Sequence, residues 1–234
     1  MSQLLSRAQR TRNGILDAAE ELFAEAGDRV TMREIALKAG VPLGLVSYHF
    51  VTKDKLFEDV VGRRAEALNT RRHQTLAALS SPTLRDIIDA FLRPYLDFNI
   101  SGGPGWRSYI RLISQTSHSG DRLALMDRHF GEIARFFTTA IAVADGGMPH
   151  ALAARCYVYM VAVMVGVFAA NDWLDTLSGG APFRDDPEAA YASLVGFLTG
   201  GFRTIAEGAD DNAASAREPA SPRPQAPRHQ KTSG

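Results

Sequence analysis

Polar side chains that could bind a charged polymer gather between residues 43 and 53. Ser47 can donate or accept a hydrogen bond, Tyr48 and His49 can reach phosphate oxygens, and Lys53 adds a positive charge. Side chains of these types contact the phosphates and base edges of DNA. The chemistry that this set indicates is recognition of DNA rather than catalysis.

A short helix over residues 43–50 would place most of this set on one side. Val46 and Phe50 are four residues apart, so they would pack inward. The opposite side then carries Leu43, Gly44, Ser47 and Tyr48. Glycine costs a helix on the order of 1 kcal/mol relative to alanine. In return, the missing side chain would let the backbone approach a duplex closely.

The flanking residues predict a second helix before this one. Thr31 and Glu34 have the spacing of a capping box. Gly40 suits a left-handed helix stop, Pro42 pre-sets the first turn of the next helix, and Thr52 can cap the helix after that. Two short helices joined by such a turn form a helix-turn-helix, whose second helix enters the major groove. The predicted DNA-binding residues are Thr31, Arg33, Leu43, Gly44, Ser47, Tyr48, His49 and Lys53.

Many positions in roughly the first quarter of the chain hold their order and spacing together. They are Ile15, Leu16, Ala18, Ala19, Leu22, Phe23, Thr31, Ile35, Ala36, Ala39, Gly40, Val41, Tyr48, His49, Phe50, Lys53 and Leu56. This pattern resembles the DNA-binding domain of the tetracycline-repressor (TetR) family of bacterial regulators. Residues 43–47 depart from it, because many relatives place more polar residues there. We therefore expect few hydrogen bonds to bases.

The overall composition is neutral, but charge is distributed unevenly along the chain. The 234 residues contain 26 basic and 26 acidic side chains, so no global field draws the protein to nucleic acid or membrane. Residues 29–55 carry five basic residues against two acidic ones, a net charge of +3. We expect these cations to face DNA. Acidic residues gather on the first helix, where we expect them to face away from it: Asp17, Glu21, Glu25 and Asp28.

Several classes of protein are disfavoured. A single cysteine fits a reducing cytoplasm, and the N-terminus lacks the apolar core of a signal peptide. The longest apolar run, residues 156–170, falls short of the ~18 residues of a membrane span, so a buried helix is expected. The sequence thus predicts a soluble, cytoplasmic protein without a membrane partner.

Enzymatic chemistry has no support in the sequence. The six histidines are dispersed without metal-ligand spacing, and no nucleophile elbow occurs. Cys156 sits in an apolar run, which predicts a raised thiol pKa and a structural role. We therefore expect no catalytic residues, no metal and no cofactor.

Helical periodicity without strand alternation predicts an all-α fold of about nine helices. An N-terminal three-helix helix-turn-helix domain would precede a C-terminal helical domain for ligand binding and dimerisation. The predicted divisions are a flexible basic arm (1–8), the DNA-binding domain (9–52), the effector and dimerisation domain (53–207) and a disordered tail (208–234). One long helix, from residue 53 to about 79, would join the two domains.

Small residues on the last two helices would permit close helix approach. The predicted dimer interface contains Gly166, Ala170, Ala189, Gly196 and Gly200. The resemblance implies that these two helices pair with their two-fold mates in a four-helix interface. The alternative is that they form the core of a monomer, which leaves the apolar character of the final pair unexplained.

Aromatic residues of the second domain could line an apolar cavity, although most buried aromatics only pack. The resemblance implies that an inducer binds among these helices and changes the spacing of two reading heads. The predicted effector-binding residues are Phe91, Tyr95, Trp106, Arg107, Tyr109, His118, Met160, Met164 and Asn171. Arg111 is a further candidate polar anchor.

The sequence, with the resemblance, predicts a ligand-responsive transcriptional regulator. We expect a repressor that binds double-stranded, palindromic operator DNA as a homodimer and is released by a small apolar or amphipathic effector. The alternative is a constitutive DNA-binding and dimerisation protein without an effector.

Overall fold

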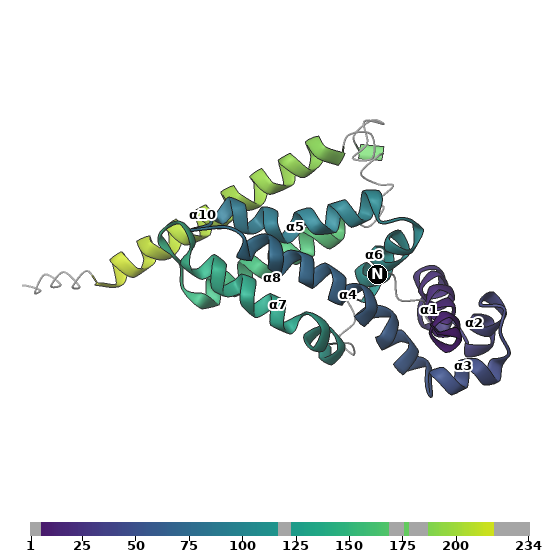
Figure 1. The fold of residues 1–234 in the computed structure, drawn as a ribbon. Coiled ribbons are helices and arrows are strands. Elements are labelled where there is room, and N and C mark those ends of the chain that lie inside the picture. The colour runs from purple at the N-terminus through teal and green to yellow at the C-terminus, as the bar shows by residue number, and fades with distance from the viewer. Residues whose placement is uncertain (1–5, 117–122, 169–175, 178–186, 218–234) are drawn as a thin grey trace, which may run out of the picture.

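The computed structural model describes residues 6–116, 123–168, 176–177 and 187–217, and these are helical, which confirms the predicted all-α class. Figure 1 shows α1–α3 gathered at one end of an elongated molecule and α10 reaching toward the other. Nine α-helices and two short 3-10 turns make up the described residues, with no strand among them. They are α1 (Arg7–Ala26), η1 (Gly27–Arg29), α2 (Met32–Lys38), α3 (Leu43–His49), α4 (Lys53–Ala77), α5 (Leu84–Ser101), α6 (Pro104–Thr116), α7 (Leu123–Val143), η3 (Ala144–Gly146), α8 (His150–Phe168) and α10 (Pro187–Arg217).

Two helix ends differ from the sequence prediction. Helix α1 begins at Arg7, inside the predicted arm, because Ser6 and Gln9 form a capping box with hydrogen bonds of 2.9 and 3.1 Å. Helix α10 continues to Arg217, beyond the expected end near residue 207. The remainder of the predicted arm and tail, residues 1–5 and 218–234, lies outside the described residues.

The turn between α2 and α3 follows from local backbone chemistry. Gly40 has a φ of 65°, the left-handed conformation that glycine adopts at little steric cost. The N–H of Val41 donates to Ala36 O at 3.0 Å and that of Gly40 to Leu37 O at 3.2 Å. This pair of hydrogen bonds is a Schellman motif, which satisfies the last carbonyls of α2. The glycine therefore fixes the direction in which α3 leaves.

Helix α4 carries the fold from one predicted domain into the other. Its first half buries Leu56, Val60 and Val61 against α1–α3, which we call the reading unit. Its second half buries Leu68 and Leu76 in the helical domain. The buried residues of both domains belong to one continuous hydrophobic cluster. A displacement of α4 in the second domain would therefore also displace the part of α4 that packs against the first.

Helix α1 also packs on α6, a contact that the sequence did not predict. The buried carboxylate of Glu20 lies 3.1 Å from Arg64 Nε on α4 and also pairs with Arg63. Burial raises the pKa of Glu20, and the two arginines oppose that effect. Arg64 in turn lies over the ring of Trp106 on α6 at 5.1 Å. These contacts attach the reading unit to the second domain along two helices.

Helix α8 is the most apolar helix of the fold. With 19 residues it is, within the described part of the chain, the one helix long and apolar enough to cross a membrane by length and composition, contrary to the sequence estimate. In the fold it contacts α5, α6, α7 and α10 and buries Cys156, Met160 and Met164. Burial raises the pKa of the Cys156 thiol, as predicted. These contacts bury one side of α8 in the fold.

Candidate DNA-reading surface and ligand cavity

Helix α3 presents the face that its periodicity predicts. Val46 and Phe50 are fully buried, while Tyr48 leaves 79% of its surface exposed. The other predicted residues on that side are also exposed: Leu43, Gly44 and Ser47. A Cβ added at Gly44 would meet no atom within 4 Å, so the backbone there is open to a large partner. Leu37 on α2, 83% exposed, extends this surface with an apolar side chain that was not predicted.

The cations near this surface are less available than the sequence count implies. Lys38 pairs with Glu21 at 2.6 Å, and Lys55 pairs with Asp59 at 2.9 Å. Lys53 donates from Nζ to Asp28 O at 2.6 Å, which leaves the ammonium close to the start of α4. Two of the five basic residues of this stretch are thus paired with carboxylates, and the acidic Glu21 does not face away from these cations, contrary to the prediction.

Two of the predicted DNA contacts, Thr31 and Arg33, lie at the start of α2 and differ in whether their side chains are engaged within the protein. Thr31 caps α2, and its hydroxyl and backbone N–H both donate to the carboxylate of Glu34 at 2.7 Å. These hydrogen bonds lower the pKa of Glu34. Arg33 is exposed and forms no ion pair with any described residue. Arg33 and Lys53, whose ammonium contacts a neutral carbonyl, are therefore the predicted cationic DNA contacts without an ion pair to a described residue.

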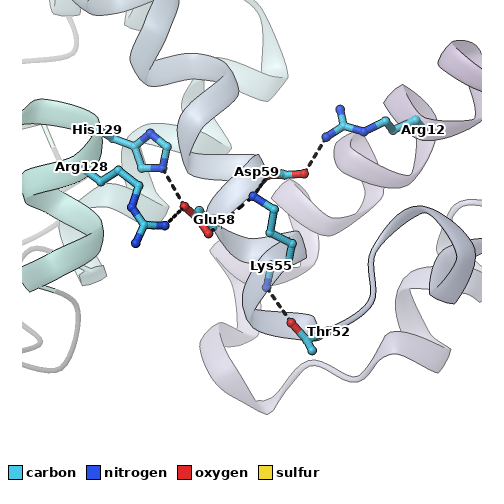
Figure 2. Close-up of polar contacts among 7 residues, drawn as sticks. All are labelled: Arg12, Thr52, Lys55, Glu58, Asp59, Arg128 and His129. Atoms are coloured by element: carbon cyan, nitrogen blue, oxygen red, sulfur yellow. Dashed lines mark hydrogen bonds and ion pairs between the residues drawn. The ribbon is translucent and has the colours of Figure 1, made fainter.

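A chain of ion pairs joins the reading unit to α7, as Figure 2 shows. Arg12 on α1 lies 2.6 Å from Asp59 and 5.1 Å from the ring centre of Phe50. Lys55 bridges Asp59 and Glu58, at 2.9 and 3.6 Å. Glu58 also pairs with Arg128 on α7, and that hydrogen bond lowers the pKa of Glu58.

Close packing holds α7 against α4 at the same place. A Cβ added at Gly62 would lie 2.7 Å from His129 Cε1, so glycine permits this approach. The amide of Asn69 donates to His129 O at 2.7 Å. The imidazole Nε2 of His129 lies 3.9 Å from Glu58, as Figure 2 shows. We call the contacts of Glu58, Gly62, Arg128 and His129 the α4–α7 junction.

A cavity of about 600 Å³ lies among α4, α5, α6, α7 and α8. This volume suits a drug-sized small molecule. Its walls are mostly apolar, with a few polar groups. The lining residues are Leu68, Arg72, Phe91, Tyr95, Tyr109, Ile113, Leu123, Met126, Asp127, Phe130, Gly131, Ala134, Tyr157, Val158, Val161, Met164 and Val165.

The cavity includes some of the predicted effector-binding residues and not others. Phe91, Tyr95, Tyr109 and Met164 line it. Trp106 does not, because its ring stacks on Phe98 at 3.8 Å near α1. Met160 is buried without lining the cavity, and Arg107 and Arg111 border a separate cleft beside Ala24 and Glu25 of α1. His118 and Asn171 lie outside the described residues.

The sequence analysis missed the one arginine of the cavity, Arg72. Its side chain is 2% exposed, and its Nε donates to Phe91 O at 2.8 Å. The guanidinium lies 3.7 Å from the centre of the Phe91 ring and its Nη2 lies 3.3 Å from the sulfur of Met164. A signal existed, since Arg72 falls between Leu68 and Leu76 at four-residue spacing, on the apolar stripe of α4.

Comparison with known proteins agrees with both halves of this arrangement. The family model "Bacterial regulatory proteins, tetR family" matches residues 15–60, and "Tetracyclin repressor-like, C-terminal domain" matches residues 89–201. The chain belongs to the TetR family. The TetR C-terminal match covers most of the cavity, so the family assignment extends beyond the helix-turn-helix.

Individual TetR relatives are similar over different lengths. The HTH-type transcriptional repressor BepR of Brucella suis biovar 1 (strain 1330) is 41% identical over 64 residues, 27% of this chain and about a third (31%) of that repressor. NalD, the secondary repressor of the MexAB-OprM multidrug efflux pump in Pseudomonas aeruginosa, is 24% identical, covering 84% of this chain and 97% of that one, with a TM-score of 0.61. Salmonella enterica GusR is 17% identical over 87% of this chain and 98% of its own, with a TM-score of 0.57.

The last two described helices of this TetR chain leave apolar surface uncovered. Four residues of the predicted dimer interface are exposed, Gly166, Ala189, Gly196 and Gly200, and Ala170 lies outside the described residues. A Cβ added at any of the three glycines would meet no atom within 4 Å. Large apolar side chains are exposed on the same two helices: Tyr159 and Phe197, the last 69% exposed.

Proposed function

We propose that this TetR-family protein is a homodimeric transcriptional repressor that reads a palindromic DNA operator with α3. The observation that carries the proposal is a capped helix pair whose second helix buries Val46 and Phe50 and exposes Ser47 and Tyr48. A recognition helix in the major groove needs this division of its faces. Such a regulator works in the cytoplasm, where its operator is.

Dimerisation through α8 and α10 would supply the second reading head. Exposed glycines let two helices approach closely, and Phe197 gives the contact a large apolar side chain. Apolar patches on a soluble surface commonly mark interaction sites. Two heads related by a two-fold axis would then match operator half-sites about 34–36 Å apart.

The cavity is the proposed effector site, and the α4–α7 junction is the proposed route to the reading heads. Phe130 and Gly131 line the cavity, while Arg128 and His129 beside them hold the start of α4 through Glu58. A ligand that fits one position of α7 better than another would shift the population of α4 positions by its differential affinity, typically 1–3 kcal/mol. The alternative, a constitutive DNA-binding protein, requires that no cavity ligand change operator affinity.

Binding to DNA fragments from upstream of its own gene tests the DNA-reading role. We expect Tyr48→Ala to cost about 1–3 kcal/mol on the operator and less on random DNA. Lys53→Ala should weaken binding to all DNA alike and lower the salt slope by about one. Thr70→Ala, exposed on α4 away from the reading head, is the matched control. Fluorescence anisotropy measures all three, and failure of the native protein to bind any such fragment at low salt contradicts the proposal.

A further inference from the structure

The cavity contains a cation, Arg72, that has no counter-ion among the described residues. No carboxylate of the described residues lies within 4.0 Å of the Arg72 guanidinium, although its side chain is almost fully buried. Asp127, the acidic residue among the described lining residues, leaves most of its side chain exposed and lies 3.4 Å from Arg135 instead. A buried charge without a partner is costly, so the protein must either compensate it internally or leave it for a ligand.

The protein compensates Arg72 only in part. Arg72 Nε donates to the backbone carbonyl of Phe91 on α5 at 2.8 Å. The Phe91 ring contributes a cation–π contact. Arg72 Nη2 has only the weakly accepting sulfur of Met164, and Nη1 makes no hydrogen bond to a described residue. Burial lowers the pKa of Arg72 to about 10, so the guanidinium is still charged at neutral pH.

Two phenols of the same cavity also lack partners. The hydroxyl groups of Tyr95 and Tyr109 are buried and form no hydrogen bond with any of the residues that the structure describes. Burial raises the pKa of both, and the nearby charge of Arg72 opposes that rise. A neutral phenol is a hydrogen-bond donor that a buried acceptor would satisfy. One positive charge and two hydroxyl donors therefore line a mostly apolar space, whose other polar lining residues are Asp127 and Tyr157.

We propose that the cavity binds an organic anion with an apolar body, a carboxylate in the simplest case. The oxyanion head accepts hydrogen bonds from the guanidinium of Arg72 and from Tyr95 or Tyr109, and the body fills the space lined by Met126, Phe130 and Val161. The role of this anion as effector rests on the proposed function, whereas its binding does not. A neutral or cationic ligand would leave Arg72 without its missing counter-ion.

Paired probes test this charge preference. We would titrate the full-length protein with 2-naphthoate and octanoate, and with their uncharged amides 2-naphthamide and octanamide, by calorimetry at neutral pH. At least one anion should bind about 10- to 100-fold more tightly than its amide, the range of a buried hydrogen bond to a charged group. Arg72→Met should remove that preference. Arg71→Met, the exposed neighbour on α4, should keep it.

Milder variants guard against loss of folding in Arg72→Met. Tyr95→Phe and Tyr109→Phe each delete only a hydroxyl, and we expect at least one of them to weaken anion binding about 3- to 10-fold. The amides should bind these variants as they bind the native protein. Equal affinity for anion and amide, an unchanged preference in folded Arg72→Met, or no binding of any probe at millimolar concentration would each overturn the proposal.

Operator binding separates this inference from the function on which it builds. If an anion binds through Arg72 but leaves operator affinity unchanged, the anion site stands and the ligand-controlled repressor does not. If an uncharged compound releases the operator while the anions bind no better than their amides, the repressor stands and the anion site falls.

Discussion

The reading surface and the cavity both use tyrosines and cations, but they place them in opposite environments. Tyr48 is 79% exposed, whereas Tyr95 and Tyr109 are buried without hydrogen-bond partners. Near the reading surface, Lys38 pairs with a carboxylate at 2.6 Å. In the cavity, Arg72 has no carboxylate within ion-pair distance among the described residues.

This difference shows that the environment of a charged side chain decides how much can be inferred about its binding partner. Water screens an exposed lysine, so its ion pair with a neighbour contributes little and can exchange for a phosphate. A buried guanidinium has no such alternative, and its unmet hydrogen bonds cost more. The single buried Arg72 thus restricts the chemistry of its ligand closely. The several exposed residues of α3 restrict the sequence of the bound DNA much less.

Disrupting the proposed dimer should give the largest difference between the two regions: operator affinity should fall while anion affinity stays nearly unchanged. The cavity is lined by one chain, whereas operator reading is proposed to need two heads. We expect Gly196→Leu to weaken the proposed dimer by about 1–3 kcal/mol per overpacked side chain, because a Cβ there faces open space in the protomer and would meet the partner helix in that dimer. Operator affinity should fall with it, while anion binding by calorimetry should stay within about twofold.

Ala67→Leu adds the same kind of bulk at an exposed position of α4 and serves as the control. Light scattering reports the oligomeric state of each variant. A native protein that is a stable monomer at micromolar concentration would remove the basis for this prediction.

Breaking the α4–α7 junction should uncouple the two regions without destroying either. Glu58→Gln removes the charge that holds Arg128. We expect the ligand-induced change in operator affinity, typically 1–3 kcal/mol in such systems, to shrink by half or more. Operator affinity without ligand should change only a few-fold. The free energy of unfolding should also change little, because Arg128 is mostly exposed.

Anisotropy titrations with and without the bound anion measure this coupling. Glu66→Gln, exposed two turns further along the same helix α4, is the control because it forms no ion pair with a described residue. If Glu58→Gln responds to the ligand as fully as this control does, the signal takes another route, such as the contact of α1 with α6.

The smallest expected effect is a pH dependence of the junction. Burial lowers the pKa of His129 below 6.5, and Glu58 only partly opposes this. The unfolded chain then binds more protons than the folded one just below pH 6.5, so the free energy of unfolding falls as the pH drops through 6.5 and levels off below the folded pKa. His129→Gln should flatten this fall between about pH 5.5 and 7.5.

Urea denaturation at a series of pH values measures the effect, with His150→Gln at the exposed start of α8 as the control. If the free energy of unfolding changes with pH equally in the native protein and in His129→Gln, then folding does not change the pKa of His129.

Local rules in the sequence determined the helices and their ends. The capping residues Thr31 and Thr52 and the left-handed Gly40 act on their own backbone neighbours, so their roles could be predicted. The exposed face of α3 followed from the four-residue spacing of Val46 and Phe50. These interactions span a few residues, and no knowledge of the tertiary fold is needed to infer them.

Only the tertiary structure decided which charges are free and which side chains meet. Lys38 and Lys55 contribute to the predicted basic excess of residues 29–55, but the fold brings Glu21 and Asp59 beside them. Arg107 lay in the predicted effector set, yet the rotation of α6 turns it to a different cleft. Ion pairs and cavities depend on the packing of several helices at once. For that reason the sequence could indicate that a cavity forms but could not assign its cation to Arg72.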